Sequence, residues 1–555
     1  MPDTTADRLI IGRIATLRGA AGPGWVEALA IAGGRVIAAG GRSQVEVLAG
    51  PRTVTWRLPT ELAVTPSFTD AHIHLASAAL AAEQPDLSGL DRSGVQRAIA
   101  AAHEARLAAG DADGWLLGHG WTFPSLAGHP EAGWLDEAAP GRPVALWAHD
   151  HHSRWLSARA IQLAGLAAKD DPPSGRIERD ADGRPTGVMY EAAAGLVDTV
   201  IPPAGAADVD WAIGAYARTL AELGVTSAHD PGAVAPDPAL QGGPVHYRAM
   251  AAAGRLPLRV MASVREEQLQ RAIEIGFRSG RGVEDDELGR YRDGWLKLFA
   301  DGSLGSRTAA LLAPYEPGDP AGPPPGGRNG MALRTFEQLV EVAGLAAAAG
   351  IASQIHAIGD AAVRTALDVI ERLPRVPGAM HRVEHAQLVD RADLARFGAL
   401  GVPASLQPSH LLSDAVAMRG SWGDRAATAF PLADLDRLDV LMPFGTDAPV
   451  ESADPWPGIA AAVCRRGAGC SEADAFHPEQ AISLVRALRG ACLDGPRSGG
   501  IHDQGHLDVG AHADLIVVPA AIFEEPGDPD VLASTRPLLT MLDGEAVFQA
   551  PDFEW

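Results

Sequence analysis

Four histidines and one aspartate in this 555-residue chain have the side-chain chemistry and spacing of a metal centre. His72 and His74 lie two residues apart in the segment PSFTDAHIH, and residues i and i+2 of a strand face the same side. His356 lies in SQIHAIGD, His385 in HRVEHAQL and Asp447 in FGTDAPV. Imidazole nitrogens and a carboxylate together bind divalent ions such as zinc. The pattern therefore predicts a metal-dependent hydrolase.

Each of these residues also has an ordinary structural interpretation. A single buried histidine is more often a hydrogen-bonded core group than a metal ligand, which applies to His356 or His385 taken alone. The pair His72 and His74 is a stronger signal, because strand geometry places both imidazoles on one face. The combination of all five residues at consistent positions relative to predicted strands favours the metal site.

The composition excludes several classes of partner. The formal charge of −24, from 46 basic and 70 acidic residues, would repel phosphate backbones and anionic lipid surfaces. The start, MPDTTADRLI, lacks the basic and apolar regions of a signal peptide, and no apolar run approaches the ~20 residues that cross a bilayer. We expect a cytoplasmic enzyme with a small-molecule substrate and neither nucleic acid nor membrane as a partner. A homodimer is an open expectation, because barrels pair through helical faces that one sequence does not reveal.

Short apolar segments alternate with alanine-rich stretches of helical period in the middle of the chain, which predicts repeated βα units and a parallel sheet. We expect helices over residues 335–350, with Thr335 as the N-cap, and over 361–373. The expected strands are 63–69, 225–229, 258–262, 295–299, 352–356, 381–385, 402–406 and 441–445. Eight parallel strands are the number that closes a TIM-like (β/α)8 barrel, where functional side chains gather at the carboxyl ends of the strands.

Both chain ends alternate β-prone segments with glycine-rich turns, including a tight turn at Asp543 and Gly544. We expect residues 1–65 and 500–555 to pair into a composite β-sandwich domain beside a barrel of residues 66–499. Residues 76–220 are too many for one crossover, so we expect a large insertion after the first strand that covers the site as a lid. The predicted fold class is therefore α/β.

Lys297, in GWLKLFADGSLGSRTA, is a sixth candidate ligand. A lysine inside an apolar strand is desolvated, which disfavours its charged form and leaves an amine that can be modified. Carboxylation by carbon dioxide would turn it into an anionic oxygen ligand able to bridge two metal ions. The alternative is an ion pair with Asp301 or Asp230.

Candidate substrate-binding residues lie in the insertion and in two loops. Trp121 of HGWTF would pack on a substrate and His152 would donate a hydrogen bond to a developing oxyanion, with lid packing and a solvated loop as the alternatives. Ser303 and Arg307 follow the fourth expected strand, where Arg307 would pair with a substrate carboxylate or with an acidic neighbour. His410 in LQPSHLL would contact substrate or cap the next helix.

Six segments occur in the order PSFTDAHIH, LGVTSAHDPG, LKLFADGSLGSRTA, QIHAIGDAAV, RVEHAQLV and GTDAPVE. Together they resemble the amidohydrolase superfamily and, more narrowly, its family-3 branch, which includes the N-substituted formamide deformylases. The resemblance continues to GHLDVGAHADLIVV near the C-terminus and covers nearly the whole chain. It is specific for the superfamily and branch but not for a substrate. It implies a distorted barrel with a side β-sandwich made from both chain ends.

The resemblance also implies roles for the candidate residues. His72 and His74 match ligands of a first metal ion, and His356 and His385 match ligands of a second. Asp447 matches a first-metal ligand that also serves as the general base.

Three further positions bear on the resemblance. Lys297 matches the strand-four position that is a carboxylated, bridging lysine in many superfamily members, although members differ in metal count. Ser67 stands where the family motif usually has glycine, which is tolerable if that turn keeps a negative φ. His151, in AHDHHSRW, also stands where the pattern usually has glycine.

These residues predict hydrolysis of a C–N bond in an amide, an N-substituted formamide or a cyclic amide. Water activated by one or two divalent ions, expected to be zinc, would attack the carbonyl, and Asp447 would pass its proton to the departing amine. The same residues suit hydrolysis of a lactone, carbamate or phosphoester, or deamination of a ring amine. A non-catalytic binding protein is a further alternative, but none of the six ligand positions is visibly replaced.

Overall fold

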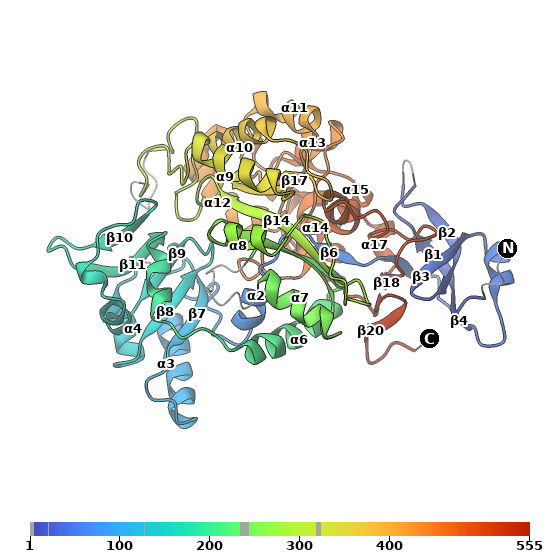
Figure 1. The fold of residues 1–555 in the computed structure, drawn as a ribbon, viewed down its shortest axis with the longest axis horizontal. Coiled ribbons are helices and arrows are strands. Elements are labelled where there is room, and N and C mark those ends of the chain that lie inside the picture. Colours follow the sequence, from blue (N-terminus) through green and yellow to red (C-terminus); the bar gives the residue numbers. More distant parts are fainter. Residues whose placement is uncertain (1–4, 20–21, 127, 233–242, 318–323, 555) are drawn as a thin grey trace.

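The computed structural model describes residues 5–19, 22–126, 128–232, 243–317 and 324–554. Its strands form three sheets, which Figure 1 shows in a row along the molecule. A parallel sheet with its helices lies in the middle. The sheet of the insertion lies on one side, and the sheet that holds both chain ends lies on the other.

The middle sheet is parallel and curled, with the strand order β17-β16-β15-β14-β13-β12-β6. Seven of the eight expected strands are found in it, paired with their neighbours in chain order. Their bounds are β6 (Phe68–Asp70), β12 (Val225–Asp230), β13 (Arg259–Arg265), β14 (Tyr291–Phe299), β15 (Ser353–Ala357), β16 (Arg382–His385) and β17 (Ala404–Ser405).

The eighth expected strand, residues 441–445, forms one isolated β-bridge instead of a regular strand, and it contacts both edges of this sheet. Phe444 forms an isolated parallel bridge with Leu406, which follows β17. The carbonyl of Phe444 also accepts a hydrogen bond from the backbone N of Ala71, next to β6, at 2.9 Å. A Cβ atom at Gly445 would lie 2.5 Å from the backbone N of His72, so only glycine allows this close approach.

The first expected strand is divided between two sheets. Its first part is β5 (Leu62–Pro66), which pairs with the chain-end sheet, and its second part is β6. Ser67 separates them, and its hydroxyl lies 2.6 Å from that of Thr226 in β12. Ser67 does not have a positive φ, so serine is tolerated at this turn.

The chain-end sheet has the order β20-β19-β18-β5-β1-β2-β3, with β4 added beside β1. Asp543 (φ 52°) and Gly544 (φ 74°) form the predicted two-residue turn between β19 and β20, where both positions require a positive φ. The remaining bounds are β1 (Arg8–Ala15), β2 (Trp25–Ala32), β3 (Arg35–Gly40), β4 (Val54–Arg57), β18 (Leu515–Pro519), β19 (Leu539–Leu542) and β20 (Glu545–Gln549).

The insertion has a five-stranded sheet of its own, in the order β10-β11-β9-β8-β7. Buried apolar side chains, Trp121 and Trp155 among them, form its core. The elements are α3 (Arg92–Ala108), β7 (Leu116–Trp121), α4 (Ala132–Ala138), β8 (Val144–Ala148), β9 (Ser153–Leu156), α5 (Ala158–Leu163), β10 (Gly175–Arg179) and β11 (Pro185–Glu191).

Helices surround the parallel sheet. The hydroxyl of Thr335 accepts a hydrogen bond from the backbone N of Gln338, which confirms Thr335 as the N-cap of α9. The helices are α2 (Leu75–Ala81), α6 (Ala206–Glu222), α7 (Pro244–Ala252), α8 (Leu269–Glu274), α9 (Phe336–Ala348), α10 (Asp360–Arg372), α11 (Arg391–Leu400), α12 (His410–Trp422), α13 (Leu432–Arg437), α14 (Pro455–Cys464), α15 (Leu484–Arg489), α16 (Gly495–Ser498), α17 (Ala521–Glu524) and α18 (Pro529–Ala533). Within the described ranges, none combines the length and apolarity needed to span a membrane.

A buried ion-pair network joins the parallel sheet to the chain-end sheet. Arg259 of β13 donates from Nε to Asp514 at 2.9 Å and also pairs with Asp543. Arg290 lies 3.1 Å from Asp543, and His512 Nδ1 lies 2.7 Å from the same carboxylate. His512, Asp514 and Asp543 are close enough together to suggest a cation site. Because two guanidinium groups already neutralise the carboxylates, we interpret the cluster as a structural network.

Replacing Arg259 with methionine is expected to destabilise the protein by about 3–5 kcal/mol at pH 7, because it leaves the buried Asp514 carboxylate without its cationic partner and removes one of two guanidinium groups from Asp543. Burial favours the neutral form of Asp543, but His512 and Arg259 outweigh it and hold the pKa of Asp543 below its ordinary value. A carboxyl with a lowered pKa contributes stability above its unfolded pKa, about 3.9, and loses it as the pH falls further. Urea unfolding from pH 7 to 3.5 should show the difference between wild type and variant shrink below about pH 4.

The control is Arg396→Met, which removes a partly exposed arginine that pairs with Asp368 and Asp393. Exposed pairs contribute about 1 kcal/mol or less. If both variants lose equal stability, Arg259 does not have the structural role inferred from the network.

Candidate metal centre

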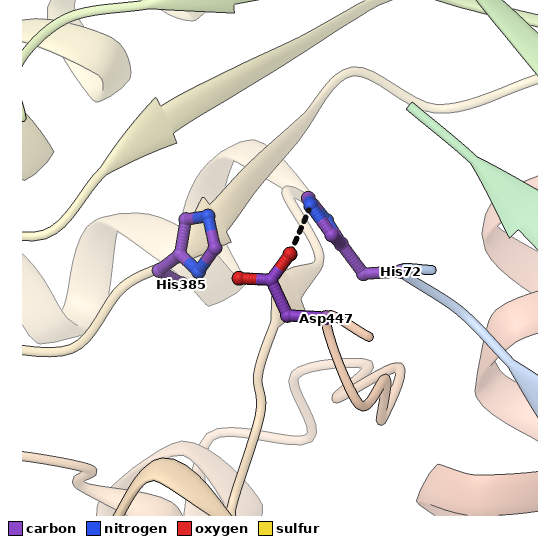
Figure 2. Close-up of side chains that lie close together, drawn as sticks. All are labelled: His72, His385 and Asp447. Atoms are coloured by element: carbon purple, nitrogen blue, oxygen red, sulfur yellow. Dashed lines mark ion pairs between the residues drawn. The ribbon is translucent and has the colours of Figure 1, made fainter. Parts of the chain in front are cut away.

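Three of the predicted ligands meet at the carboxyl-end edge of the parallel sheet. His72, His385 and Asp447 each present one ligand atom, and these atoms all lie within 4.8 Å of one another. Figure 2 shows the Asp447 carboxylate between the two imidazoles, with Oδ1 3.5 Å from His72 Nε2. All three side chains are buried. His72 therefore lies beside two residues that follow it by more than 300 positions in the chain.

Backbone strain brings two of these side chains into position. His385 has φ 68° and Asp447 has φ 63°, in the left-handed region that residues other than glycine seldom adopt. Successive residues of a strand normally face opposite sides, yet Glu384 and the following His385 both contact this site. The positive φ of His385, at the end of β16, accounts for the change of direction. Strained residues of this kind gather at functional sites.

The other two predicted histidines lie directly beside this group. His74 Nε2 is 3.4 Å from Asp447 Oδ1. The ring of His356 is 4.4 Å from the ring of His385, measured between centroids. The structure therefore brings all four histidines and the aspartate together.

Hydrogen bonds to three of the imidazoles determine which ring nitrogen carries the proton. His72 Nδ1 donates to the carboxylate of Glu384, and His74 Nδ1 donates to the carbonyl of Gly232 at 2.6 Å. His356 Nε2 donates to the carbonyl of Gly302 at 3.1 Å. Carbonyl and carboxylate oxygens only accept, so in the neutral imidazole the opposite nitrogen of each of these rings keeps its lone pair. Histidines that bind metals are oriented by acceptors in this way.

Glu384 and Arg382 are functional candidates that the sequence did not reveal. Both belong to β16 and are fully buried, and Arg382 Nε lies 2.5 Å from Glu384 Oε1. Burial favours the neutral form of Glu384, but the charge of Arg382 outweighs it and holds the pKa of Glu384 well below its ordinary value. The signal in the sequence was the i, i+2 spacing of two charges in a short apolar strand, which predicts one buried face.

The donor set passes a simple test for a divalent cation. His72 Nε2 is buried, has no hydrogen-bond partner among the described residues and faces Asp447. Burial, and next the charge of Lys297, lowers the pKa of His72 to about 4, which keeps the ring neutral. Neutral imidazole nitrogens beside a carboxylate are the ligands that zinc and similar ions bind.

Lys297 lies on β14 with its side chain buried, and its Nζ is 4.8 Å from the centre of the Phe299 ring. Its ion-pair alternatives are occupied elsewhere. Asp301 accepts backbone N–H groups of residues 310, 358 and 359, and Asp230 accepts the hydroxyl of Tyr247. Burial lowers the pKa of Lys297 to about 7, so a neutral amine is accessible.

The insertion contributes a second group of polar side chains. His152 Nδ1 lies 2.9 Å from Glu191, and its ring lies 5.4 Å from that of His356. Burial would lower the pKa of His152, but the charge and hydrogen bond of Glu191 outweigh it and raise the pKa to about 9. Asp150 accepts a hydrogen bond from the hydroxyl of Ser303 at 2.7 Å. These contacts attach the insertion to the loop after β14.

The remaining predicted substrate-binding residues occupy different positions. His410 begins α12 and lies beside the centre, with Nε2 3.9 Å from Asp447 Oδ2. Arg307 is buried with φ 56°, and its guanidinium lies 5.4 Å from the centre of the Tyr315 ring. Trp121 lies inside the insertion core and donates from Nε1 to the carbonyl of Leu146 at 3.0 Å. Its position agrees with the alternative of packing within the insertion.

Comparison with known proteins places this site in a family. Residues 60–548 match the family model described as the amidohydrolase family. The chain belongs to the amidohydrolase family. It is a hydrolase.

Two curated relatives of this amidohydrolase align along most of their length. It is 31% identical over 500 residues to the Bacillus subtilis (strain 168) protein YtcJ, whose name describes it as an amidohydrolase. The alignment covers 87% of this chain and 88% of YtcJ. It is 24% identical over 520 residues to the N-substituted formamide deformylase of Arthrobacter pascens, covering 89% of this chain and 90% of the relative.

Solved structures agree with the metal-dependent nature of the site. The structure of an uncharacterised metal-dependent hydrolase from Pyrococcus horikoshii OT3 superposes with a TM-score of 0.72 at 27% identity. The match covers 95% of this amidohydrolase and 98% of that chain. Together with the His72, His385 and Asp447 group, this similarity supports a divalent metal ion.

Replacing Glu384 with glutamine is expected to weaken metal binding by this amidohydrolase about 10- to 100-fold, because the single, uncharged oxygen of glutamine cannot accept from both His72 and Arg382. Competition with a chelator of known affinity measures the change, and thermal unfolding reports any loss of stability from the unpaired Arg382. The matched control is Glu191→Gln, which alters the partner of His152 instead. Equal metal affinities in wild type and Glu384→Gln would contradict the orienting role.

Proposed function

We propose that this amidohydrolase hydrolyses a C–N bond in an amide, an N-substituted formamide or a cyclic amide. The proposal rests on one observation: the Nε2 atoms of His72 and His74, which keep their lone pairs, both lie next to the Asp447 carboxylate. The alignment with an N-substituted formamide deformylase over 89% of the chain supports the choice of bond.

The proposed metal ligands are His72, His74, Lys297, His356, His385 and Asp447, holding one or two ions that we expect to be zinc. A divalent ion supplies a Lewis acid that acidifies water and polarises a carbonyl. In the two-ion case Lys297 is carboxylated, and its lowered pKa supports this by leaving an amine that can react with carbon dioxide. In the one-ion case Lys297 stays an unmodified amine.

Asp447 is the proposed general base. Its carboxylate lies between His72 and His74 on one side and His410 on the other, at 3.4 to 3.9 Å. It takes the proton of the attacking water and then gives it to the departing nitrogen, because an amide nitrogen cannot leave as an anion. One carboxylate thus serves both halves of the reaction.

His152 is the proposed hydrogen-bond donor to the carbonyl oxygen. Because Glu191 raises its pKa to about 9, His152 carries a proton on both ring nitrogens at neutral pH. A positive donor fixed beside His356 stabilises negative charge that develops on the substrate. Ser303, Arg307 and His410 are proposed to shape the remaining substrate site. Trp121 is proposed to act only through the packing of the insertion.

The proposal includes an architecture in which the curled sheet and the segment around Phe444 form a (β/α)8 barrel of residues 66–499. Residues 1–65 and 500–555 form the composite domain, and 76–220 form the insertion. The proposed substrate is a small molecule. A cytoplasmic location and a homodimer stay predictions from the sequence.

A substrate panel tests the reaction. Zinc-loaded protein is assayed with N-formyl amines, N-acyl amino acids, cyclic amides, lactones, carbamates, phosphoesters and ring amines. We expect turnover of at least one C–N substrate with kcat/KM above about 10⁴ M⁻¹s⁻¹. A preference for lactones or phosphoesters over every amide would replace the proposed bond while keeping the site.

A further inference from the structure

His151 lies in the insertion between β8 and β9 and adopts a backbone conformation that favours glycine. Its φ is 54°, in the left-handed region. Residues other than glycine are uncommon in this region, although histidine adopts it more often than most. Such a conformation persists where the surrounding structure holds the residue, so the contacts of the His151 side chain bear on its role.

The imidazole of His151 packs against an aromatic ring, but its two nitrogens make no hydrogen bond within the described residues. Nδ1 and Nε2 are both buried and have no hydrogen-bond partner among the described residues. The ring stacks on Trp147, with centroids 5.5 Å apart and planes at 21°. Most buried polar groups in proteins are paired, so two unpaired nitrogens on one ring point to a partner that binds from outside.

His151 precedes His152, whose ring lies 5.4 Å from that of His356, and follows Asp150, which accepts a hydrogen bond from Ser303 in the loop after β14. These contacts place His151 on the insertion side of the metal centre. Neither ring nitrogen is paired with a carboxylate among the described residues, and a buried imidazolium without such a partner is costly, so the ring is neutral. A neutral imidazole offers one N–H donor and one lone-pair acceptor.

We propose that His151 binds the substrate through both ring nitrogens and selects molecules with an uncharged group that donates and accepts hydrogen bonds, such as a carboxamide or a hydroxyl, near the scissile bond. This inference rests on the proposed function, since it names the substrate class of that same site. A carboxylate only accepts and an ammonium only donates, so either leaves one nitrogen unpaired. A hydrocarbon leaves both unpaired, which disfavours its binding.

Two probes of similar size test the selection, N-formylglycinamide and N-formylisobutylamine, in which an isopropyl group replaces the carboxamide. We expect zinc-loaded wild type to prefer N-formylglycinamide by about tenfold in kcat/KM, equivalent to about 1.4 kcal/mol. In His151→Gly the preference should fall to about one. His151→Asn should keep part of it, because asparagine tolerates a positive φ and offers both a donor and an acceptor.

Two controls separate this role from folding and metal binding. The zinc content of His151→Gly should equal that of wild type, because His151 is not a proposed ligand. Its Tm should change by only a few degrees, because the freedom of glycine at positive φ offsets the lost stacking on Trp147. An unchanged preference for N-formylglycinamide in His151→Gly would overturn the inference.

A binding measurement keeps the inference distinct from the reaction. Calorimetry with the zinc-loaded Asp447→Asn protein should give about tenfold tighter binding of N-formylglycinamide, and the preference should vanish when His151→Gly is added. If neither the probes nor any C–N substrate of the panel is hydrolysed but this pattern holds, the proposed function fails and the inference stands. Equal or undetectable affinities for both probes overturn the inference, even where C–N hydrolysis is observed.

Discussion

Replacing Asp447 with asparagine is expected to lower kcat/KM by at least about a thousandfold while leaving a folded protein that still holds metal. The amide cannot accept the proton of the attacking water, and general bases typically contribute about 10²- to 10⁴-fold. The side chains differ little in size, and the histidines around the position stay in place. Steady-state kinetics on the best substrate of the panel, with metal analysis and thermal unfolding of the same preparation, measures the effect.

The matched control is Asp454→Asn. Asp454 is another buried aspartate, seven residues further on, and its side chain accepts a hydrogen bond from the backbone N of Trp456 at the start of α14. Asparagine caps helices as well as aspartate does, so this variant should keep its activity within a few-fold. Near-normal activity in Asp447→Asn would exclude Asp447 as the base.

Removing the divalent ion with a chelator is expected to abolish turnover, with a loss of at least about a thousandfold, and added zinc should restore it. Without the ion, His72, His74 and His385 keep their positions but cannot acidify water. Activity is measured before dialysis, after dialysis and after stepwise addition of zinc. Full activity in protein that elemental analysis shows to be free of metal would refute the proposed chemistry.

The stepwise addition also counts the ions. If Lys297 is carboxylated, wild type should need two equivalents of zinc for full activity, and Lys297→Ala should bind about one fewer. Electron density of the zinc-loaded crystal at the Lys297 amine distinguishes a carboxylated from a bare lysine. One equivalent in both proteins would favour the one-ion case.

Local signals in the sequence predicted several elements well. Thr335 caps α9, and Asp543 with Gly544 turns between β19 and β20, because each depends on residues within a few positions. The parallel strands were visible as apolar segments between helical ones. Strand boundaries were less predictable, since Ser67 divides one apolar run between two sheets through contacts with Thr226 and other distant residues.

The site itself was predictable only in part. The spacing of His72 and His74, and the placement of His385 and Asp447 after strands, indicated the ligands. Only the folded structure shows that Glu384 orients His72 and that a positive φ turns His385 toward the site. Trp121 was predicted to contact the substrate, with packing as the alternative, and it lies in the hydrophobic core of the insertion. The sequence alone does not distinguish an aromatic residue of a binding site from one of a core.

The sequence by itself determined which chemical groups this amidohydrolase has and at which strand ends they lie, because periodicity and turn residues act over a few neighbouring positions. Only the tertiary structure decided which nitrogen of His72, His74 and His356 carries its proton and which side chains of the insertion reach the centre. Those features depend on acceptors such as Glu384 and the carbonyl of Gly232, which are distant in the chain. Hydrogen bonds act over about 3 Å, so their pairing is set only when the folded sheets bring the groups together.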